Sequence, residues 1–199
     1  MGPVFVKGNL NFADDDIQYF KQIAFNQNHL KDEDGIKFDF VKSKTWSITN
    51  IPGKLLDVLD QTFNQNNIWD LELYQPLQVR YLDLIKYNSD SFLNWHVDTD
   101  ESQVLTSPFY GEHKLDTFAY DYGLLNKLSI TICLSDITDY EGGEFEIFDT
   151  RSGEIVHSEK LNKYEFIMFP SAVAHRVKTL TSGERWALAT WAKGPVYNT

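Results

Sequence analysis

The sequence predicts an α+β fold with a mainly β core, of the sandwich or barrel-like jelly-roll type. Three observations favour this class. Segments rich in aliphatic, β-branched and aromatic residues recur from about residue 71 onward, and turn-forming residues separate them. These segments do not alternate with helical patterns, which argues against a parallel α/β sheet. The hydrophobic fraction of 42% supplies enough apolar material for a packed interior.

The chain length favours one domain. A chain of 199 residues can bury a sizeable core but is too short to expect two domains. We therefore expect a single domain over residues 1–199. Within it, residues 1–75 form a flanking region with helices and strand-like stretches, and residues 77–195 form the jelly-roll core.

Two helices are predicted in the flanking region. The acidic run Asp14–Asp16 favours a helix start, because carboxylates stabilise the positive end of the helix dipole. Pro52 suits the first position of a second helix. Apolar residues recur at helical spacing in both segments, so we expect each helix to pack on a sheet through one face. These residues are Ile17, Phe20, Ile23 and Ala24 in the first helix and Leu55, Leu56, Leu59 and Phe63 in the second.

Strand signals dominate the rest of the chain. Turn chemistry near residues 139–143, 151–153 and 181–183 separates several of the strands. The long polar stretch Thr99–Gly123 is rich in aromatic residues, and a loop of this length is typically functional, so it is the candidate substrate lid. The predicted strands are Leu71–Tyr74, Leu77–Tyr87, Leu128–Leu134, Glu144–Phe148, Glu165–Phe169, Ala172–Val177 and Arg185–Trp191.

The net charge of −11 argues against nucleic acid as a partner, because the average surface repels phosphate. The acidity serves either solubility alone or a preference for basic substrates. No apolar run reaches the length of a membrane span, and the first residues lack a signal-peptide core. Cys133 is the only cysteine, which excludes an intrachain disulfide. We therefore expect a cytoplasmic protein without membrane contact.

Two imidazoles and one carboxylate form a candidate metal site. His96 and Asp98 are two residues apart, so in a strand both side chains point to one face. His175 lies in another strand-like segment that a jelly roll can bring alongside. Two His and one carboxylate leave open positions on an octahedral metal, as in non-haem Fe(II) oxygenases, whereas structural zinc sites use four protein ligands. The His-x-Asp pair alone is weak evidence, since a single His is more often a surface or core residue.

Arg185 follows His175 by ten residues and strengthens this interpretation. A hairpin with its turn near residues 181–183 would return Arg185 roughly opposite His175. A guanidinium there suits bidentate capture of a carboxylate. The alternative is a surface Arg in a salt bridge, for instance with Glu184 or Glu165.

A family resemblance rests on several segments: Tyr87–Asp98, Leu128–Asp136, Tyr140–Phe145, His175–Val177 and Gly183–Trp191. Together they resemble 2-oxoglutarate- and Fe(II)-dependent dioxygenases of the prolyl 4-hydroxylase type, and within these the PKHD-type hydroxylases of bacteria and viruses. The resemblance covers residues 77–195, and the motifs are specific in combination.

The resemblance implies a double-stranded β-helix with N-terminal flanking helices. It implies that His96, Asp98 and His175 bind Fe(II) and that Arg185 anchors the distal carboxylate of 2-oxoglutarate. Tyr87 would reach the co-substrate; the alternative for it is a core aromatic residue. The implied reaction uses O2, converts 2-oxoglutarate to succinate and CO2, and hydroxylates an unactivated C–H bond, with ascorbate as a reductant. The expected substrate is a prolyl residue of a peptide or protein.

Several positions depart from the family pattern or stay outside it. A second Tyr that assists the anchoring Arg in some relatives aligns with Leu134, and Ser129 or Thr131 is the substitute we consider. We expect Trp191 to pack under the site. Gly142 and Gly143 are expected in a tight turn. The three remaining histidines are expected on the surface: His29, His113 and His157.

Other functions remain open on the sequence alone. The same chemistry on another residue or on a free amino acid is one alternative, and a non-catalytic jelly-roll binding module is a second. A cupin with a different metal would use more His ligands, and a nucleic-acid demethylase would carry another Arg soon after Arg185. The sequence leaves the substrate and the oligomeric state open.

Overall fold

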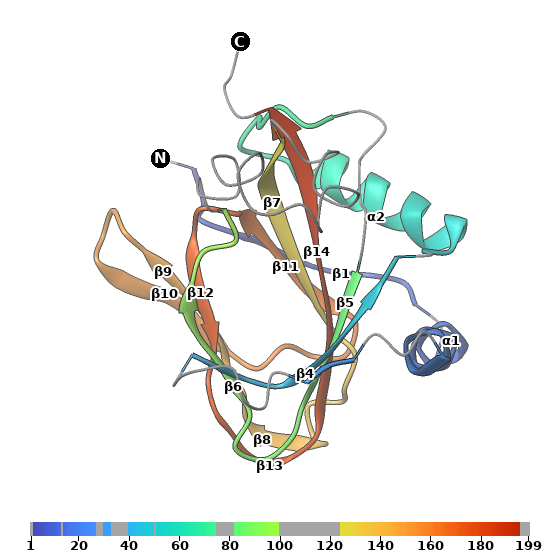
Figure 1. Cartoon of the computed structure of the whole chain (residues 1–199). Coiled ribbons are helices and arrows are strands. Elements are labelled where there is room, and N and C mark those ends of the chain that lie inside the picture. Colours follow the sequence, from blue (N-terminus) through green and yellow to red (C-terminus); the bar gives the residue numbers. More distant parts are fainter. Residues whose placement is uncertain are drawn as a thin grey trace, which may run out of the picture.

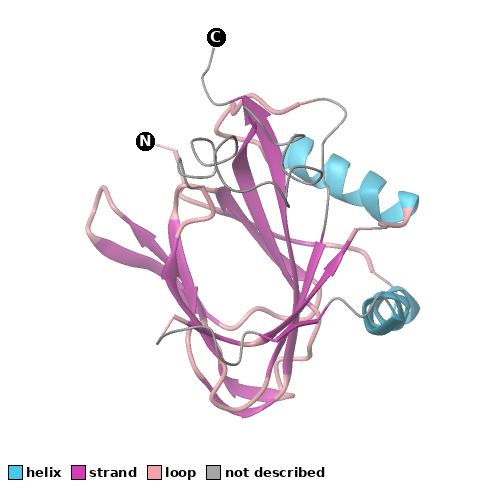
Figure 2. Cartoon of the chain, viewed as in Figure 1, coloured by secondary structure: helices cyan, strands magenta, loops and turns pink. Residues whose placement is uncertain are grey.

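The computed structural model describes residues 2–12, 14–26, 30–32, 40–49, 51–74, 82–99 and 124–195. Two antiparallel sheets face each other, and two helices lie against the outer side of the larger one (Figures 1 and 2). This arrangement confirms the predicted α+β fold with a jelly-roll core. Apart from Thr99, the expected lid Thr99–Gly123 lies outside the described residues.

The larger sheet, called the major sheet here, has seven strands. The long central strands are β7 and β14, and their pairing runs from Ala187 opposite Cys133 to Pro195 opposite Leu124. In spatial order the strands are β1 (Val6–Asn9), β11 (Glu165–Pro170), β7 (Leu124–Cys133), β14 (Arg185–Pro195), β5 (Leu82–Tyr87), β4 (Lys44–Ile48) and β2 (Leu30–Asp32).

The smaller sheet, called the minor sheet, has five strands, and a separate two-stranded ribbon closes one end of the molecule (Figure 1). The ribbon pairs β8 (Tyr140–Gly142) with β13 (Leu180–Gly183). In spatial order the minor sheet contains β10 (Glu154–Glu159), β9 (Phe145–Asp149), β12 (Ala174–Val177), β6 (Phe92–His96) and β3 (Val41–Lys42).

Helices α1 (Asp14–Asn26) and α2 (Gly53–Asn66) cover the major sheet as the apolar spacing predicts. Both helices contribute Leu, Ile or Phe side chains to one buried cluster with that sheet. Full burial of one such side chain stabilises the folded state by roughly 1.5–3 kcal/mol. Pro52 is the N-cap residue and not the first helical residue. Leu56 is half-buried, while Thr62 is buried and donates to the Val58 carbonyl.

A second apolar cluster fills the space between the two sheets. Strand alternation sends every other side chain of β7 to each side. Ile130 and Ile132 belong to the cluster under the helices, whereas Cys133 belongs to the cluster between the sheets. The interior between the sheets is therefore the place where polar side chains of the two sheets can meet.

The turn regions differ from the sequence prediction. Residues 71–74 are not a strand, and the expected turns near 139–143 and 181–183 contain the strands β8 and β13. Strands β12 and β14 consequently do not form a hairpin but lie in different sheets. Gly142 and Gly143 both have positive φ, as expected for a tight turn. Within the described residues, no helix is long and apolar enough to cross a membrane.

Candidate active site

Three of the predicted site residues meet on the inner side of the minor sheet. The ligand atoms of His96, Asp98 and His175 all lie within 4.8 Å of one another. One oxygen of Asp98 is 3.5 Å from Nε2 of His96, and the other is 3.6 Å from Nε2 of His175. His175 lies more than 70 residues after His96 and Asp98 in the sequence. It reaches them because β6 and β12 pair with His96 directly opposite His175.

Backbone carbonyls orient both imidazoles. Nδ1 of His96 lies 2.8 Å from the Asn94 carbonyl oxygen, and Nδ1 of His175 lies 3.0 Å from that of Val173. A carbonyl accepts only, so each Nδ1 must carry the proton and donate it. The lone pair then resides on Nε2, the atom that faces the Asp98 carboxylate. This arrangement is how metal-binding histidines are typically held in the correct tautomer.

Asp98 does not lie in a strand, contrary to the prediction. Strand β6 ends at His96, and Asp98 follows in a bend. Its backbone N–H donates to the Ser171 carbonyl at 2.8 Å, and its carbonyl accepts from the Asn126 amide at 3.0 Å. Loop contacts rather than strand alternation therefore bring the carboxylate to the two imidazoles.

The charge states of the cluster suit metal binding. Burial works against ionisation of Asp98, but its interactions with His96, His175 and Ser129 lower its pKa to about 2. Burial lowers the pKa of His175 to about 4. At neutral pH the site thus offers a carboxylate and a neutral His175 imidazole, which are the protonation states that a divalent metal requires. The donor set fits Fe(II), with positions left open for other ligands.

A cavity of about 260 Å³ between the two sheets reaches the cluster of His96, Asp98 and His175, called the His-Asp-His cluster here. His96, Asp98 and His175 line one part of it. Tyr87 and Trp191 line the side formed by the major sheet, so Trp191 faces the site directly instead of packing beneath it. The remaining wall is mainly apolar, and it includes Leu93, Phe145, Phe169 and Val177.

Arg185 is buried, and no described residue provides a counter-ion for it. Its side chain is 1% exposed, and all three guanidinium nitrogens lack a hydrogen-bond partner within the described residues. The guanidinium lies 5.2 Å from the ring centre of Tyr87, the residue paired with it on β5. The salt-bridge alternative is wrong, because Glu184 pairs with Lys86 and Glu165 with Lys7. A buried cation without an anion is costly, so this position calls for an anionic ligand.

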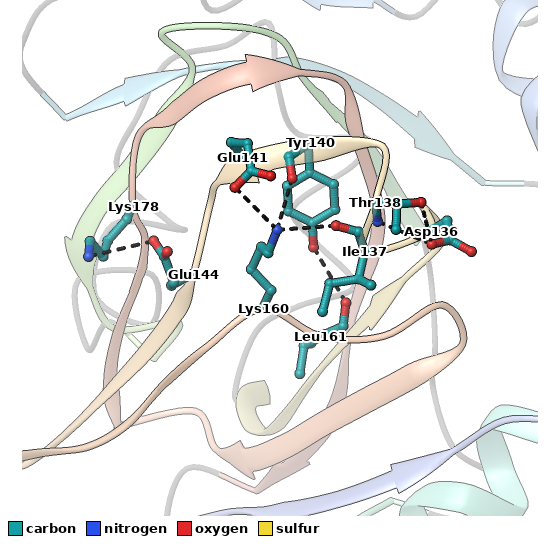
Figure 3. A network of polar contacts seen from close by, with 9 residues as sticks. All are labelled: Asp136, Ile137, Thr138, Tyr140, Glu141, Glu144, Lys160, Leu161 and Lys178. Carbon is teal, nitrogen blue, oxygen red and sulfur yellow. Dashed lines mark hydrogen bonds and ion pairs between the residues drawn. The ribbon is translucent and has the colours of Figure 1, made fainter.

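Tyr140 is a neighbour of Arg185 that the sequence did not single out. It is 2% exposed, and its hydroxyl lies 3.4 Å from the Leu161 carbonyl and 3.9 Å from the Cys133 sulfur. Figure 3 shows this ring beside the Lys160 side chain, with its hydroxyl directed at the Leu161 carbonyl. Burial, with Cys133 adding to it, raises the pKa of Tyr140, while the nearby charge of Arg185 opposes the rise. The hydroxyl therefore keeps its proton at neutral pH and can donate it to an anion.

The residues considered as helpers of Arg185 lie elsewhere. Leu134 is part of the cluster under the helices and faces away from the cavity. Ser129 pairs with Trp191 in the β7–β14 register, far along the strand from Arg185, and its hydroxyl contacts that of Ser171 at 2.9 Å. Thr131 pairs with Ala189. Ser129 instead hydrogen-bonds to Asp98 and helps to lower its pKa.

His157 is also placed differently from the prediction. It is buried against Phe5, with ring centres 5.1 Å apart, and does not lie on the surface. His29 and His113 lie outside the described residues.

Comparison with known proteins places this geometry in a family. The sequence pattern of the 2OG-Fe(II) oxygenase superfamily matches residues 82–193. A PKHD-type hydroxylase of Psychrobacter sp. (strain PRwf-1) is 46% identical over 69 residues, which cover 35% of this chain and 26% of that protein. A PKHD-type hydroxylase of Idiomarina loihiensis is 38% identical over 88 residues, 44% and 38% of the two chains. The matched part of the chain thus spans less than half of the length of either relative.

Solved structures share the fold at low sequence identity. A prolyl-4-hydroxylase from Pseudomonas putida aligns with a TM-score of 0.62 and 16% identity over 96% of this chain and 92% of its own. A prolyl hydroxylase from Trichoplax adhaerens, in complex with a peptide fragment of hypoxia inducible factor, aligns with a TM-score of 0.65 and 12% identity over 95% and 83%. With the matching family pattern, the jelly roll and the His-Asp-His cluster, the chain belongs to the 2OG-Fe(II) oxygenase superfamily, whose cofactor and co-substrate are Fe(II) and 2-oxoglutarate.

Proposed function

We propose that this protein is a dioxygenase that hydroxylates an unactivated C–H bond, most simply that of a prolyl residue in a peptide or protein. The observation that carries the proposal is the buried Arg185, which has no anionic partner in the described residues. Its guanidinium lies against Tyr87, and Tyr87 lines the same cavity as the His-Asp-His cluster. The hydroxylase names of the sequence relatives and the peptide bound to the Trichoplax enzyme support the reaction and the substrate class.

Each residue of the site has a separate role in the proposed reaction. His96, Asp98 and His175 hold Fe(II), and Arg185 holds the distal carboxylate of 2-oxoglutarate, with Tyr87 flanking the co-substrate. When bound, the metal supplies the redox chemistry by which O2, 2-oxoglutarate and R–H yield R–OH, succinate and CO2. The apolar cavity wall keeps bulk water from the reacting groups, which limits side reactions. The protein thus positions reactants and excludes water. Ascorbate as a reductant and a cytoplasmic location remain predictions.

An anaerobic titration of the protein with Fe(II) and 2-oxoglutarate tests the proposal. The chelate of the two has a weak visible charge-transfer band, which should appear in the wild type and disappear in His175→Ala. His157→Ala is the matched control, because it removes a buried imidazole outside the cluster and should keep the band. A folded wild-type protein without the band would contradict the proposal and favour a non-catalytic binding module.

The substrate class needs a second measurement. Proline-containing peptides, other peptides and free amino acids should be compared for substrate-dependent formation of succinate and for a mass gain of one oxygen atom. Hydroxylation of prolyl peptides is the expected result. Oxygen incorporation only into a free amino acid or into another residue would overturn the substrate while leaving the reaction class intact.

A further inference from the structure

Strand β6 carries a β-bulge directly before the ligand His96. In the pairing of β6 with β12, His96 lies opposite His175, but Leu93 lies opposite Val177. Two residues lie between the pairing positions on β6, but only one lies between them on β12. Asn94 and Trp95 therefore share the single position opposite Arg176. Bulges of this kind bend a strand and redirect side chains, and they recur beside active sites.

The bulge determines where the His96 ring points. Leu93 and His96 both line the cavity although His96 is three positions after Leu93, and in a regular strand residues three positions apart point to opposite faces. The Asn94 carbonyl accepts the Nδ1–H of His96, and the Asn94 side chain accepts the backbone N–H of Trp95 at 2.8 Å. Without the extra residue, the register would turn His96 to the opposite face of the sheet.

A row of side chains on the outer face of the minor sheet holds the bulge. The guanidinium of Arg176 lies 4.6 Å from the ring centre of Trp95 and donates from Nε to Glu146 at 2.6 Å. Glu146 also accepts from the Ser158 hydroxyl at 2.6 Å. We call these four side chains the bulge clamp: Trp95 on β6, Arg176 on β12, Glu146 on β9 and Ser158 on β10. They join four neighbouring strands of the minor sheet, on the face opposite to the His-Asp-His cluster.

The Arg176–Glu146 pair of the clamp is more buried than the neighbouring ion pair of Lys178 and Glu144, which lie directly after β12 and directly before β9. The side chain of Glu146 is 5% exposed, so its carboxylate is largely removed from water and committed to Arg176 and Ser158. By contrast, Lys178 and Glu144 form a single contact at 3.5 Å with side chains 44% and 29% exposed (Figure 3). Only the clamp stands opposite the bulge.

We propose that the bulge clamp positions His96 for metal binding, which makes Trp95, Arg176 and Glu146 positioning residues of the metal-dependent reaction. This inference rests on the proposed function, because it takes His96 as a metal ligand. A planar guanidinium can stack on an indole and bind a carboxylate at the same time, so Arg176 links the bulge to the two strands beyond it. None of the clamp side chains lines the cavity or belongs to the His-Asp-His cluster, so the clamp would act through the backbone of residues 94–96.

The test compares Arg176→Met with the matched control Lys178→Met. Both remove the cation of an ion pair, at Arg176 in β12 or at Lys178 directly after it, and both leave a glutamate in or directly before β9 without its ion-pair partner. Co(II) serves as an optical probe of the site. We expect Arg176→Met to weaken Co(II) binding by about 10- to 100-fold, the range typical of lost support behind a metal ligand, while Lys178→Met changes it less than about 3-fold. Equal Co(II) affinity in wild type and Arg176→Met would overturn the proposal.

Trp95→Leu is a second variant that tests the same proposal if Arg176→Met does not fold. It removes the stacking partner but leaves the Arg176–Glu146 pair intact, and the same loss of Co(II) affinity is expected. A merely structural role would lower the melting temperature of the variants without changing the site. The second measurement is therefore the proton NMR spectrum of the Co(II) protein, in which each ligand histidine gives a shifted exchangeable N–H signal.

The NMR signal of His96 should shift or broaden in both clamp variants, whereas that of His175 should persist. Unchanged signals from both histidines, in variants that bind Co(II) like the wild type, would show that the clamp only stabilises the fold. A wild-type protein that binds neither Co(II) nor Fe(II) would instead overturn the proposed function. The two failures are therefore distinguishable.

Discussion

At the scale of single residues, Arg185 shows how a site can be built at the expense of stability. Its guanidinium is removed from water, and burial works against its charge, although the neighbouring thiol and phenol groups keep its pKa above the ordinary value. No described side chain accepts a hydrogen bond from it. Such a residue weakens the free protein and becomes favourable only when an anion binds.

Replacing Arg185 with Met should therefore separate stability from binding. We expect the free energy of unfolding of the metal-free variant to rise by roughly 1–4 kcal/mol, since an unpaired buried charge is replaced by a side chain of similar volume. Binding of 2-oxoglutarate should be lost. Chemical denaturation and the anaerobic titration measure the two effects. A variant that is less stable and still binds 2-oxoglutarate would show that Arg185 has a purely structural role.

Tyr140 is the residue that we expect to assist Arg185. Tyr140→Phe should weaken binding of 2-oxoglutarate by about tenfold or more, because a hydrogen bond to a charged group contributes roughly 1.5–3 kcal/mol. Pyruvate is the control ligand: it has the keto acid end of 2-oxoglutarate but no distal carboxylate, so its binding should not change. Equal losses for both ligands in a titration of the Fe(II) protein would place the effect of Tyr140 at the metal instead.

At the scale of elements, the ribbon of β8 and β13 sets the entry of the chain into β14 and hence the position of Arg185. Gly183 ends β13 with φ +81°, and a Cβ there would collide with the Asp139 carbonyl oxygen. Gly183→Ala should destabilise the protein by about 1–3 kcal/mol and weaken 2-oxoglutarate binding. Gly153→Ala is the control, because it has φ +74° but open space around a Cβ. Similar stabilities of the two variants in urea unfolding would contradict this role of the close contact.

The sequence predicted those elements whose signal is local. Apolar spacing indicated the two helices, and β-rich segments indicated most of the central strands. The ribbon was missed because its glycines and polar residues resemble a turn, while its strands pair only with each other across almost forty residues. The bulge before His96 was missed for a similar reason, because it is defined by the register against β12.

The residues of the site likewise fall into those that the sequence predicted and those that it did not. The ligand set and Arg185 could be named because their residue types and order along the chain are distinctive. The bend that holds Asp98, and the approach of Tyr140 to Arg185, depend on contacts between distant strands and loops. The burial of His157 could not be predicted either, since its own strand is otherwise largely exposed.

At the scale of the whole molecule, the His-Asp-His cluster makes the free energy of unfolding depend on pH. The pKa of His175 is about 4 in the folded protein, against 6.5 as its ordinary value. Between these values the unfolded chain binds more protons than the folded one, so the contribution of His175 is fully present above pH 6.5 and is lost as the pH falls to 4. One pKa unit corresponds to 1.36 kcal/mol, which gives a loss of about 3 kcal/mol.

Metal binding should extend this dependence below pH 4, because a metal-bound His175 must lose its proton and the metal-free folded protein takes that proton up only near pH 4. We therefore expect the rise in melting temperature with Mn(II), a probe that does not react with O2, to be smaller at pH 3.5 than at pH 7.5. At one hundred times its dissociation constant, a ligand of the folded state adds about 2.7 kcal/mol. His175→Gln should abolish the gain from Mn(II) at both pH values and flatten the acid dependence of the metal-free protein. A wild-type protein whose melting temperature rises equally with Mn(II) at pH 3.5 and pH 7.5 would show that the ion binds away from His175.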